Sequence, residues 1–535
     1  MSLRELPARP NLEHLKNQAR KLLRQALESD ASASFRFAAI GVTSQQPKLA
    51  DALHVIAREH GFETWPALRL NLEANSENPV EALTAALKSN DVSLVRNVLV
   101  RHPSLKSQIN EPLPGYGFDA PAIIAAVHHN NREIIDLLLD AGANINERSR
   151  WWAGSFGVLD SAGSDLAAYL ISRGAIVDIH AAARLGMVDR VRQLLADAPQ
   201  LVHARGGDGQ LPLHFAASVE IASLLLDHGA EIDARDIDHE STATQYMVCQ
   251  RQHMEWREPH RHDIARFLIS RGAQVDILAA SAIGDLSLVA RILNDDPETI
   301  RTTVTERYFP KQNPGSGGSI YIYGFGWTKT PHMVAMEFGH KAVFELLMQR
   351  SPGWLRLLQA AELGDETLFQ QVLQKHPTLF ARLTTNASRR LIGTAIRNND
   401  RAVKLLVEAG WPVNAAMENN QTALHYAAWH GNLTMVRALL DHNALPNVFE
   451  NEHGGTPLAW ALHGSLHSWH CDRGDYPGVA RALLAAGATI PQPERPLEAT
   501  DEVLEIIRSH MALVPSSDKN ISVVQRAGRA GASDR

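Results

Sequence analysis

Short segments of similar sequence recur along the 535 residues of this chain. LPLHFAA (211–217), TALHYAA (422–428) and TPLAWA (456–461) each precede an apolar segment, and the turn after that segment contains glycine in the first and third copies. Glycine readily adopts the left-handed conformation that commonly follows a helix end, so these turns predict helix termini. The turn glycines are Gly142, Gly174, Gly229, Gly272, Gly410 and Gly487. Helical units that repeat in this way stack on their neighbours, so the pattern predicts a solenoid.

A second repeated signal is a proline that stands eight residues after an apolar position. The four pairs are separated from one another by 96, 98 and 80 residues, which suggests that the repeats were duplicated in blocks. Proline cannot continue a helix, so each pair predicts a helix that ends at the same boundary. The pairs are Val95 with Pro103, Val191 with Pro199, Val289 with Pro297, and Phe369 with Pro377.

These segments resemble the ankyrin repeat, whose signature is T-P-L-H-x-A in a unit of about 33 residues. The resemblance implies an all-α ankyrin-repeat solenoid, with about twelve helix pairs between residues 79 and 491. Residues 1–75 have helical periodicity but no such signature, and they resemble the helical leader that precedes ankyrin arrays in some bacterial proteins. The leader is expected to cap the solenoid, or alternatively to dock a partner. Residues 494–511 are expected to form a C-terminal capping helix, followed by a disordered tail at 512–535.

Composition narrows the class of protein. The net charge is −7, which argues against general affinity for the phosphate backbone of nucleic acids. Two cysteines, Cys249 and Cys471, are too few for a disulfide framework and suit a reducing compartment. Neither a secretory signal nor an apolar run of about 18 residues is visible in the sequence. We therefore expect a cytoplasmic protein that binds neither nucleic acid nor membrane and carries no cofactor.

The resemblance also implies which side chains line the concave groove of the array. The histidines of the signature, His214 and His425, are expected to bond backbone between repeats. Aromatic side chains supply large contact areas with little entropy loss, so rings in the groove would suit partner binding. Alternatively, these rings pack against adjacent repeats. The implied groove residues are Phe215, Tyr246, Tyr426, Trp429, His430, Trp460 and His463.

Four insertions replace the short turns that ordinarily join repeat helices: residues 147–160, 249–263, 305–332 and 465–477. Long loops in compact repeats tend to be functional. Alternating apolar residues at 320–323, bounded by glycines, predict a short β-hairpin in the third insertion. The insertions add Trp256, Tyr323, Trp327 and Trp469 to the expected binding residues.

No motif for catalysis is evident. His463, His467, His470, Cys471 and Asp472, like the cluster His253, His260 and His262, do not match an established zinc spacing, so no metal site is expected. There is no G-x-S-x-G, and sequence does not show whether Asp160, Asp238, Glu240 or Asp475 converge. Asp236 and Asp238 fit hydrogen-bonding roles in a hairpin turn. Two hypotheses remain: a non-enzymatic scaffold for a protein partner, or a small-molecule-binding or hydrolytic site roofed by the insertions.

Overall fold

The computed structural model describes residues 11–42, 47–249, 261–491 and 497–513, together with Arg4 and Leu6. The chain divides into two compact units, residues 1–346 and 347–535, which we describe separately. Within the described residues the secondary structure is helical, and β-pairing is limited to isolated bridges in turns. The predicted all-α class is therefore confirmed. None of the described helices is both long and apolar enough to traverse a lipid bilayer.

The first unit begins with four helices that have a core of their own. The apolar stripe predicted from the sequence is buried there, at Leu15, Ala19 and Leu22. A bidentate ion pair from Arg36 to the buried carboxylate of Glu59 crosses this bundle. The last of the four helices packs against the first helix of the array, α5. The four are α1 (Leu12–Leu27), α2 (Ala31–Ala38), α3 (Leu49–Glu59) and α4 (Trp65–Ala74).

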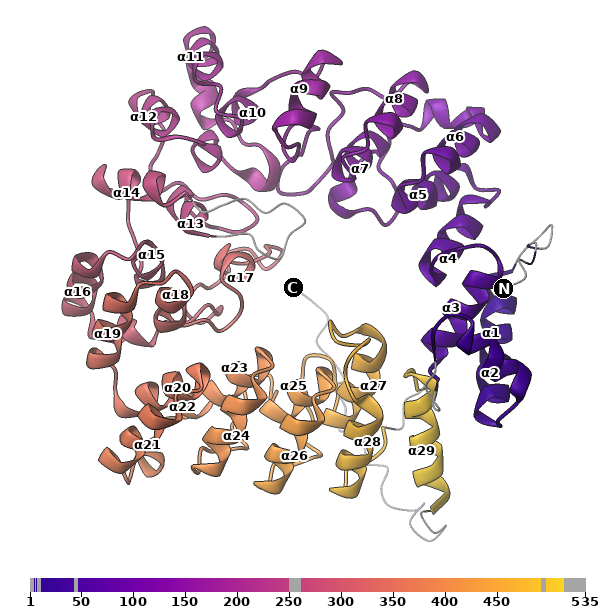
Figure 1. Cartoon of the computed structure of the whole chain (residues 1–535). Coiled ribbons are helices and arrows are strands. Elements are labelled where there is room, and N and C mark those ends of the chain that lie inside the picture. The colour runs from indigo at the N-terminus through magenta and orange to yellow at the C-terminus, as the bar shows by residue number, and fades with distance from the viewer. Residues whose placement is uncertain are drawn as a thin grey trace, which may run out of the picture. The chain divides into compact units, whose positions relative to one another are not determined.

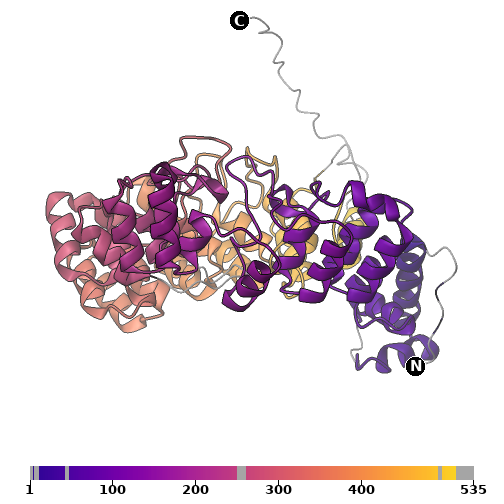
Figure 2. The ribbon, with the colours of Figure 1, turned by 90° about the horizontal axis from the view of Figure 1, so that it is seen from above.

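The rest of the first unit is an array of helix pairs, in which α5 contacts α7 and α6 contacts α8 (Figure 1 and Figure 2). Its helices are α5 (Pro79–Ser89), α6 (Val92–Arg101), α7 (Ala122–His128), α8 (Arg132–Asp140), α9 (Ser164–Ser172), α10 (Ile179–Arg184), α11 (Val188–Asp197), α12 (Val219–Asp227), α13 (Ala243–Val248), α14 (His262–Ser270), α15 (Ile277–Ile283), α16 (Leu286–Asp295), α17 (Tyr321–Gly324), α18 (Pro331–Glu337) and α19 (Lys341–Arg350), which crosses the division. Short 3₁₀ turns are η1 (Pro103–Ser107), η2 (Gly117–Asp119), η3 (Pro199–His203), η4 (Gly207–Gly209), η5 (Pro212–Phe215) and η6 (Pro297–Arg301).

The second unit continues the same arrangement. Helices α23, α25 and α27 form one row and α24, α26 and α28 another, with contacts along each row (Figure 1). The elements are α20 (Gly353–Leu363), α21 (Glu366–Lys375), η7 (Phe380–Arg382), α22 (Thr385–Ser388), α23 (Arg390–Ile396), α24 (Asp400–Glu408), α25 (Ala423–Trp429), α26 (Leu433–Asp441), α27 (Pro457–His467), α28 (Tyr476–Ala485) and α29 (Asp501–Leu513).

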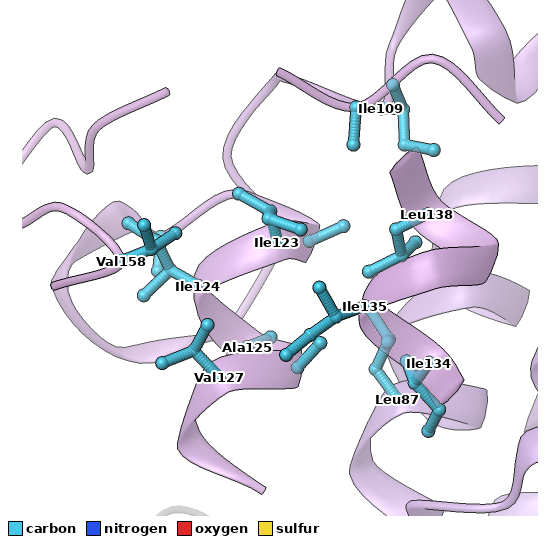
Figure 3. Packing of buried hydrophobic residues seen from close by; sticks show 14 of the residues in the cluster. Leu87, Ile109, Ile123, Ile124, Ala125, Val127, Ile134, Ile135, Leu138 and Val158 are labelled. Carbon is cyan, nitrogen blue, oxygen red and sulfur yellow. The ribbon is translucent and has the colours of Figure 1, made fainter. Parts of the chain in front are cut away.

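The apolar core runs continuously from one repeat to the next. In Figure 3, Ile123 and Ala125 of α7 lie beside Ile135 and Leu138 of α8, and Leu87 of α5 joins them from the preceding repeat. These side chains are at most 1% exposed. Burial of one such leucine or isoleucine side chain stabilises the fold by about 1.5–3 kcal/mol, which is why a helix pair needs its neighbours.

The helix boundaries follow the two signals in the sequence. The six turn glycines have φ between +86° and +102°, a region that other residues rarely occupy. Pro103, Pro199 and Pro297 each begin a 3₁₀ turn, and the apolar residue eight positions earlier is buried in each case. Both predictions of helix ends are thus confirmed.

The β-hairpin predicted for residues 305–332 is wrong, because no strand forms there. Residues 321–324 form the short helix α17, in which the amide of Gly324 donates to the carbonyl of Ile320. Consecutive side chains Ile320 and Tyr321 are both buried, whereas a strand would place them on opposite faces. Burial of the Tyr321 ring, whose hydroxyl donates to Asp276, therefore outweighs the strand pattern.

The predicted C-terminal segments fall partly outside the described residues. Within 494–511 the helix α29 begins at Asp501, and it extends to Leu513, two residues into the expected tail. Val503 and Ile507 are buried on one side of this helix, as expected for a capping helix. Residues 492–496 and 514–535 lie outside the described residues.

Candidate functional site

Four of the expected binding residues form one cluster of rings in the second unit. Tyr426 and Trp429 lie three residues apart on α25, and Trp460 and His463 have the same spacing on α27. Residues spaced in this way share one face of a helix. Because α25 and α27 are neighbours, the two faces join into a single patch, which we call the aromatic surface.

The rings of the aromatic surface contact one another across the repeat boundary. The centroid of Trp460 is 5.2 Å from that of Tyr426 and 6.3 Å from that of Trp429, both edge-on. The rings of Trp429 and His463 stack with centroids 5.7 Å apart. The first three side chains are half-buried and His463 is exposed, so the surface combines fixed geometry with access to solvent.

A glycine permits the close approach of the two helices. A Cβ on Gly464 would lie 2.6 Å from the carbonyl oxygen of Trp429, a separation that real structures do not allow. That same carbonyl accepts a hydrogen bond from the hydroxyl of Tyr476 at 2.8 Å. Gly464 and Tyr476 therefore fix the backbone carbonyl of Trp429 between them.

A buried carboxylate orients Trp460. Glu450 is 0% exposed, and its oxygens accept hydrogen bonds from the amides of Glu452, His453 and Gly455 and from Nε1 of Trp460, the last at 3.4 Å. Burial alone would raise the pKa of Glu450, but the hydrogen bonds outweigh it and hold the pKa below its usual value. The carboxylate is thus ionised when it orients the indole.

An equivalent arrangement exists in the first unit. Asp236 accepts hydrogen bonds from the amides of His239 and Ser241 and from the hydroxyl of Tyr246 at 3.0 Å. In both repeats the acid precedes the threonine at the helix N-cap by six residues and the ring by ten. That spacing is a signal the sequence contains. The hairpin role of Asp236 was predicted from its position in a turn, and the role of Glu450 was not predicted.

Two expected binding residues are buried instead. Tyr246 is 5% exposed, because its hydroxyl reaches inward to Asp236. His430 is 3% exposed, because its Nε2 donates to the carbonyl of Ile396 in the preceding repeat at 3.0 Å. Burial and the nearby His470 lower the pKa of His430 to about 4. Tyr246 is fixed within its own repeat and His430 joins two repeats, so neither side chain belongs to an accessible surface.

The remaining expected residues do not join the aromatic surface. Phe215 is half-buried and packs edge-on against His180, and Tyr323 is half-buried and donates to the carbonyl of Gly317. Trp327 and Trp469 are exposed, the latter by 73%. Trp256 lies outside the described residues.

The signature histidines have the structural role that was predicted for them. His214 Nε2 donates to the carbonyl of Ser241 at 3.1 Å, and His425 Nε2 donates to that of Gly455 at 3.4 Å. Each carbonyl belongs to the next repeat. Burial lowers the pKa of both imidazoles, which favours the neutral form.

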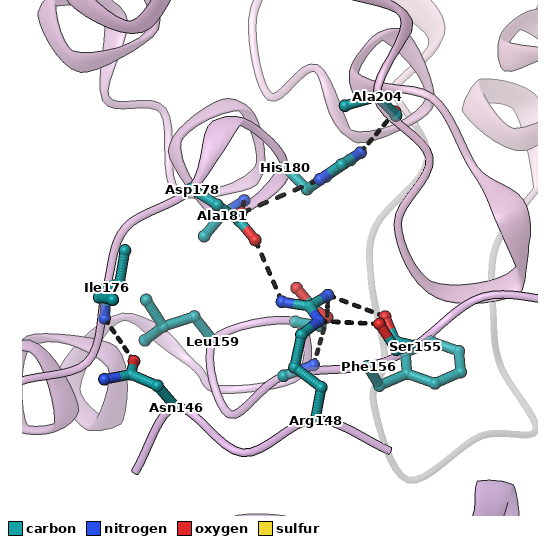
Figure 4. A network of polar contacts seen from close by, with 12 residues as sticks. Asn146, Arg148, Ser155, Phe156, Leu159, Ile176, Asp178, His180, Ala181 and Ala204 are labelled. Atoms are coloured by element: carbon teal, nitrogen blue, oxygen red, sulfur yellow. Dashed lines mark hydrogen bonds and ion pairs between the residues drawn. The ribbon is translucent and has the colours of Figure 1, made fainter. Parts of the chain in front are cut away.

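The insertion at 147–160 folds onto its own unit through Arg148. The guanidinium donates to Oγ and to the carbonyl of Ser155, and it pairs with Asp160 and Asp178 at 3.2 and 3.1 Å (Figure 4). Burial raises the pKa of Asp160 against the opposing effect of Arg148. The ion pairs and hydrogen bonds of Arg148 therefore fix the insertion against the first unit.

At its tip this insertion contacts the backbone of η4. A Cβ on Gly154 would lie 2.0 Å from the carbonyl oxygen of Gly206 and 2.7 Å from the amide nitrogen of Gly209. We expect Gly154→Ala to destabilise the first unit by about 2 kcal/mol, because backbone atoms cannot yield as side chains do. Gly163→Ala is the control, since a Cβ there meets nothing within 4 Å. Chemical denaturation checks the difference; equal midpoints would contradict the packing described.

The third insertion closes over a cavity of about 550 Å³ in the first unit. Its walls come from the turn before α13, the turn before α15, and residues 308–319. Asp276 lies in the wall and accepts hydrogen bonds from Gln245 and Tyr321 at 3.2 and 2.9 Å, and burial raises its pKa. The alternative hypothesis expected a site roofed by all four insertions, whereas among the described residues only the third insertion lines this cavity. The role of Asp276 was not predicted, because it depends on where that insertion folds.

Comparison with known proteins assigns the repeats. The model "Ankyrin repeats (3 copies)" matches residues 179–279, 357–450 and 391–490, and the model "Ankyrin repeat" matches residues 120–150. The chain contains ankyrin repeats. These matched ranges include α25 and α27, so the aromatic surface lies on two consecutive ankyrin repeats.

A curated relative also carries ankyrin repeats by name. The chain is 23% identical over 476 residues to the ankyrin repeat domain-containing protein SAT10 of Stachybotrys chartarum. The match covers 78% of this chain but only 23% of the relative's length. The comparison therefore supports the ankyrin repeats, not the activity of the longer protein.

Proposed function

We propose that this protein is a non-enzymatic scaffold whose ankyrin repeats bind a protein partner through the aromatic surface. The observation that carries the proposal is the continuous contact of Tyr426, Trp429, Trp460 and His463 across two repeats, with each ring at least partly exposed to solvent. Indole and phenol groups combine a large apolar area with a polar tip and dominate binding hot spots. Because Glu450 orients Trp460 in advance, little side-chain entropy is lost on binding.

The test replaces one ring of the surface. We expect Trp429→Ala to weaken partner binding by about 2 kcal/mol, or roughly 30-fold, as hot-spot tryptophans do. Immobilised full-length protein would first capture partners from native lysate, with quantitative mass spectrometry. The affinity for a purified partner would then be measured by interferometry.

The matched control is Trp152→Ala, because Trp152 is 46% exposed and lies outside the aromatic surface. A partner that binds the control and the wild type equally, but the Trp429 variant weakly, supports the proposal. Equal affinity of all three proteins would place the partner elsewhere and reject this surface.

The flanking helices support an accessory part of the same proposal. We propose that α1–α4 cap the array at its N-terminal end and that α29 caps it at the other, since terminal repeats need a covered apolar face. The packing of α4 on α5 and of α29 on α28 supports both roles. Neither Cys249 nor Cys471 takes part in a disulfide, which fits the proposed cytoplasmic location.

A second candidate function is small-molecule binding in the cavity of the first unit. Its volume of about 550 Å³ and its mixed polar and aromatic walls favour this alternative. A thermal-shift screen with a metabolite library tests it, because a ligand at a hundredfold excess over its Kd stabilises by about 2.7 kcal/mol. A hit that Asp276→Asn abolishes would place the ligand there, and a screen without hits would remove the candidate.

A further inference from the structure

Two turns of the first unit bring two carboxylates and an imidazole together. Asp208 lies in η4, and Asp238 and His239 lie in the turn before α13. One ligand atom from each residue lies within 4.8 Å of those from the other two. Nε2 of His239 is 3.7 Å from Oδ2 of Asp208 and 3.8 Å from Oδ2 of Asp238. All three side chains are buried, so this is not an ordinary cluster of surface acids.

A backbone carbonyl fixes the tautomer of His239. Its Nδ1 lies 3.1 Å from the carbonyl oxygen of Gly318, and a carbonyl only accepts hydrogen bonds, so Nδ1 carries a proton. Nε2 is therefore the ring atom that faces the carboxylates. A histidine that binds metal through one nitrogen almost always donates its other N–H to a carbonyl or carboxylate, as His239 does.

The distances leave room for a cation between the groups. If Nε2 were also protonated, a charge-assisted hydrogen bond to a carboxylate would measure about 2.7–2.9 Å. The observed 3.7 and 3.8 Å are too long for such a bond. Donors that each lie about 2.0–2.2 Å from one ion stand at most roughly 4.4 Å apart, and both distances fit this limit.

The surrounding backbone holds the ligands in place. The carbonyl of Asp208 accepts hydrogen bonds from the amides of Ile237 and Asp238, both at 3.0 Å, which joins the two turns. Asp208 has a φ of +55°, a left-handed conformation that is uncommon outside glycine. Oδ1 of Asp238 accepts from the amide of Gly317 at 3.0 Å, which leaves Oδ2 directed toward His239. Such preorganisation is typical of built sites.

We propose that Asp208, Asp238 and His239 bind one divalent transition-metal ion, with zinc as the best match to two carboxylates and an imidazole. Three protein ligands leave one tetrahedral position for water or another ligand. His239 also lines the cavity of about 550 Å³, so the ion lies at its border. The site is independent of the aromatic surface, which lies in the other unit.

The test uses full-length protein that has been stripped with a chelator and then titrated with Zn²⁺ by calorimetry. We expect one equivalent to bind, and we expect Asp238→Asn and His239→Gln each to weaken binding by at least about 100-fold, because each removes a direct ligand. His228→Gln is the control, since this histidine is exposed at the end of α12. It should bind zinc as the wild type does.

A second measurement keeps the test decisive if a variant fails to fold. The Co²⁺-substituted wild-type protein should show d–d absorption without a thiolate charge-transfer band, because its ligands are oxygen and nitrogen. A wild-type protein that binds no stoichiometric Zn²⁺, Mn²⁺ or Co²⁺ would overturn the proposal. So would folded Asp238 and His239 variants that bind zinc normally, or a thiolate band, which would implicate Cys249 or Cys471.

Discussion

Replacing Glu362 by alanine is expected to lower the free energy of unfolding of the second unit by about 3–5 kcal/mol, the usual cost of removing one partner of a buried ion pair. Glu362 lies on α20 and pairs with Arg397, which follows α23 in the next repeat. Their side chains are only 6% and 15% exposed. Loss of the carboxylate would leave the guanidinium without its principal anion in a site shielded from water.

The ion pair belongs to a network of hydrogen bonds, which increases the stability that is lost when Glu362 is removed. Glu362 also accepts hydrogen bonds from the hydroxyl of Thr394 at 2.6 Å and from the side-chain amide of Asn399 at 3.0 Å. Both donors lie in the following repeat, so one carboxylate joins two layers of the array. Removing a partner from buried donors costs more than a hydrogen bond contributes when it forms.

Glu366→Ala is the matched control. Glu366 lies on the next helix and pairs with Arg401 of the same following repeat, but both side chains are more than 60% exposed. Exposed pairs contribute about 0–1 kcal/mol, so this change should be nearly neutral. Urea denaturation, with hydrogen exchange read on peptides from α20 and α23, checks both variants. Equal effects of the two substitutions would contradict the role given to burial.

Acidification should destabilise the second unit through His430. Its pKa is lowered from about 6.5 to about 4 by burial and by His470, whose ring centroid lies 5.2 Å away. Between these values the unfolded chain binds a proton at this histidine and the folded chain does not, so stability falls as the pH falls. The loss over this interval amounts to about 3 kcal/mol, and above pH 6.5 the contribution is constant.

His430→Gln isolates this effect, because the glutamine amide can still donate to the carbonyl of Ile396. We expect the variant to lose less stability than the wild type between pH 6.5 and 4.5. This holds even if the substitution itself changes the free energy of unfolding at pH 7.5. Denaturation midpoints at several pH values give the two slopes. Parallel curves would mean that His430 is protonated in the folded protein without penalty.

Much of the fold could be predicted because its signals are local. Gly410 and Gly487 mark helix ends by their own backbone preference, and Pro103 cannot continue the helix that precedes it. The roles of His214 and His425 followed from the repeat signature. Phe215 and Tyr246 illustrate the limit: they occupy equivalent positions in their repeats, yet the structure buries Tyr246 more deeply because Asp236 accepts its hydroxyl.

The long-range features could not be predicted in the same way. Asp208 and His239 lie in different repeats, and only the folded backbone places them together. The error at residues 320–323 has the same origin, since Tyr321 is buried by a partner, Asp276, that lies 45 residues earlier. The role of Glu450 is different, because the sequence does contain a signal for it. Glu450 precedes Trp460 by the same number of residues as Asp236 precedes Tyr246.

The contacts of residues 312–320 determine how the first unit is expected to unfold. In most repeat proteins each layer touches only its neighbours, and unfolding can begin at an end and travel inward one layer at a time. Here the amides of Gln312, Gly317 and Ile320 donate to Glu240, Asp238 and Ser241, a turn that lies two repeats earlier. The loop thus skips over the intervening pair α15 and α16. Layers bound together in this way must open as one cooperative block, so the middle of the unit should resist fraying longer than either of its edges.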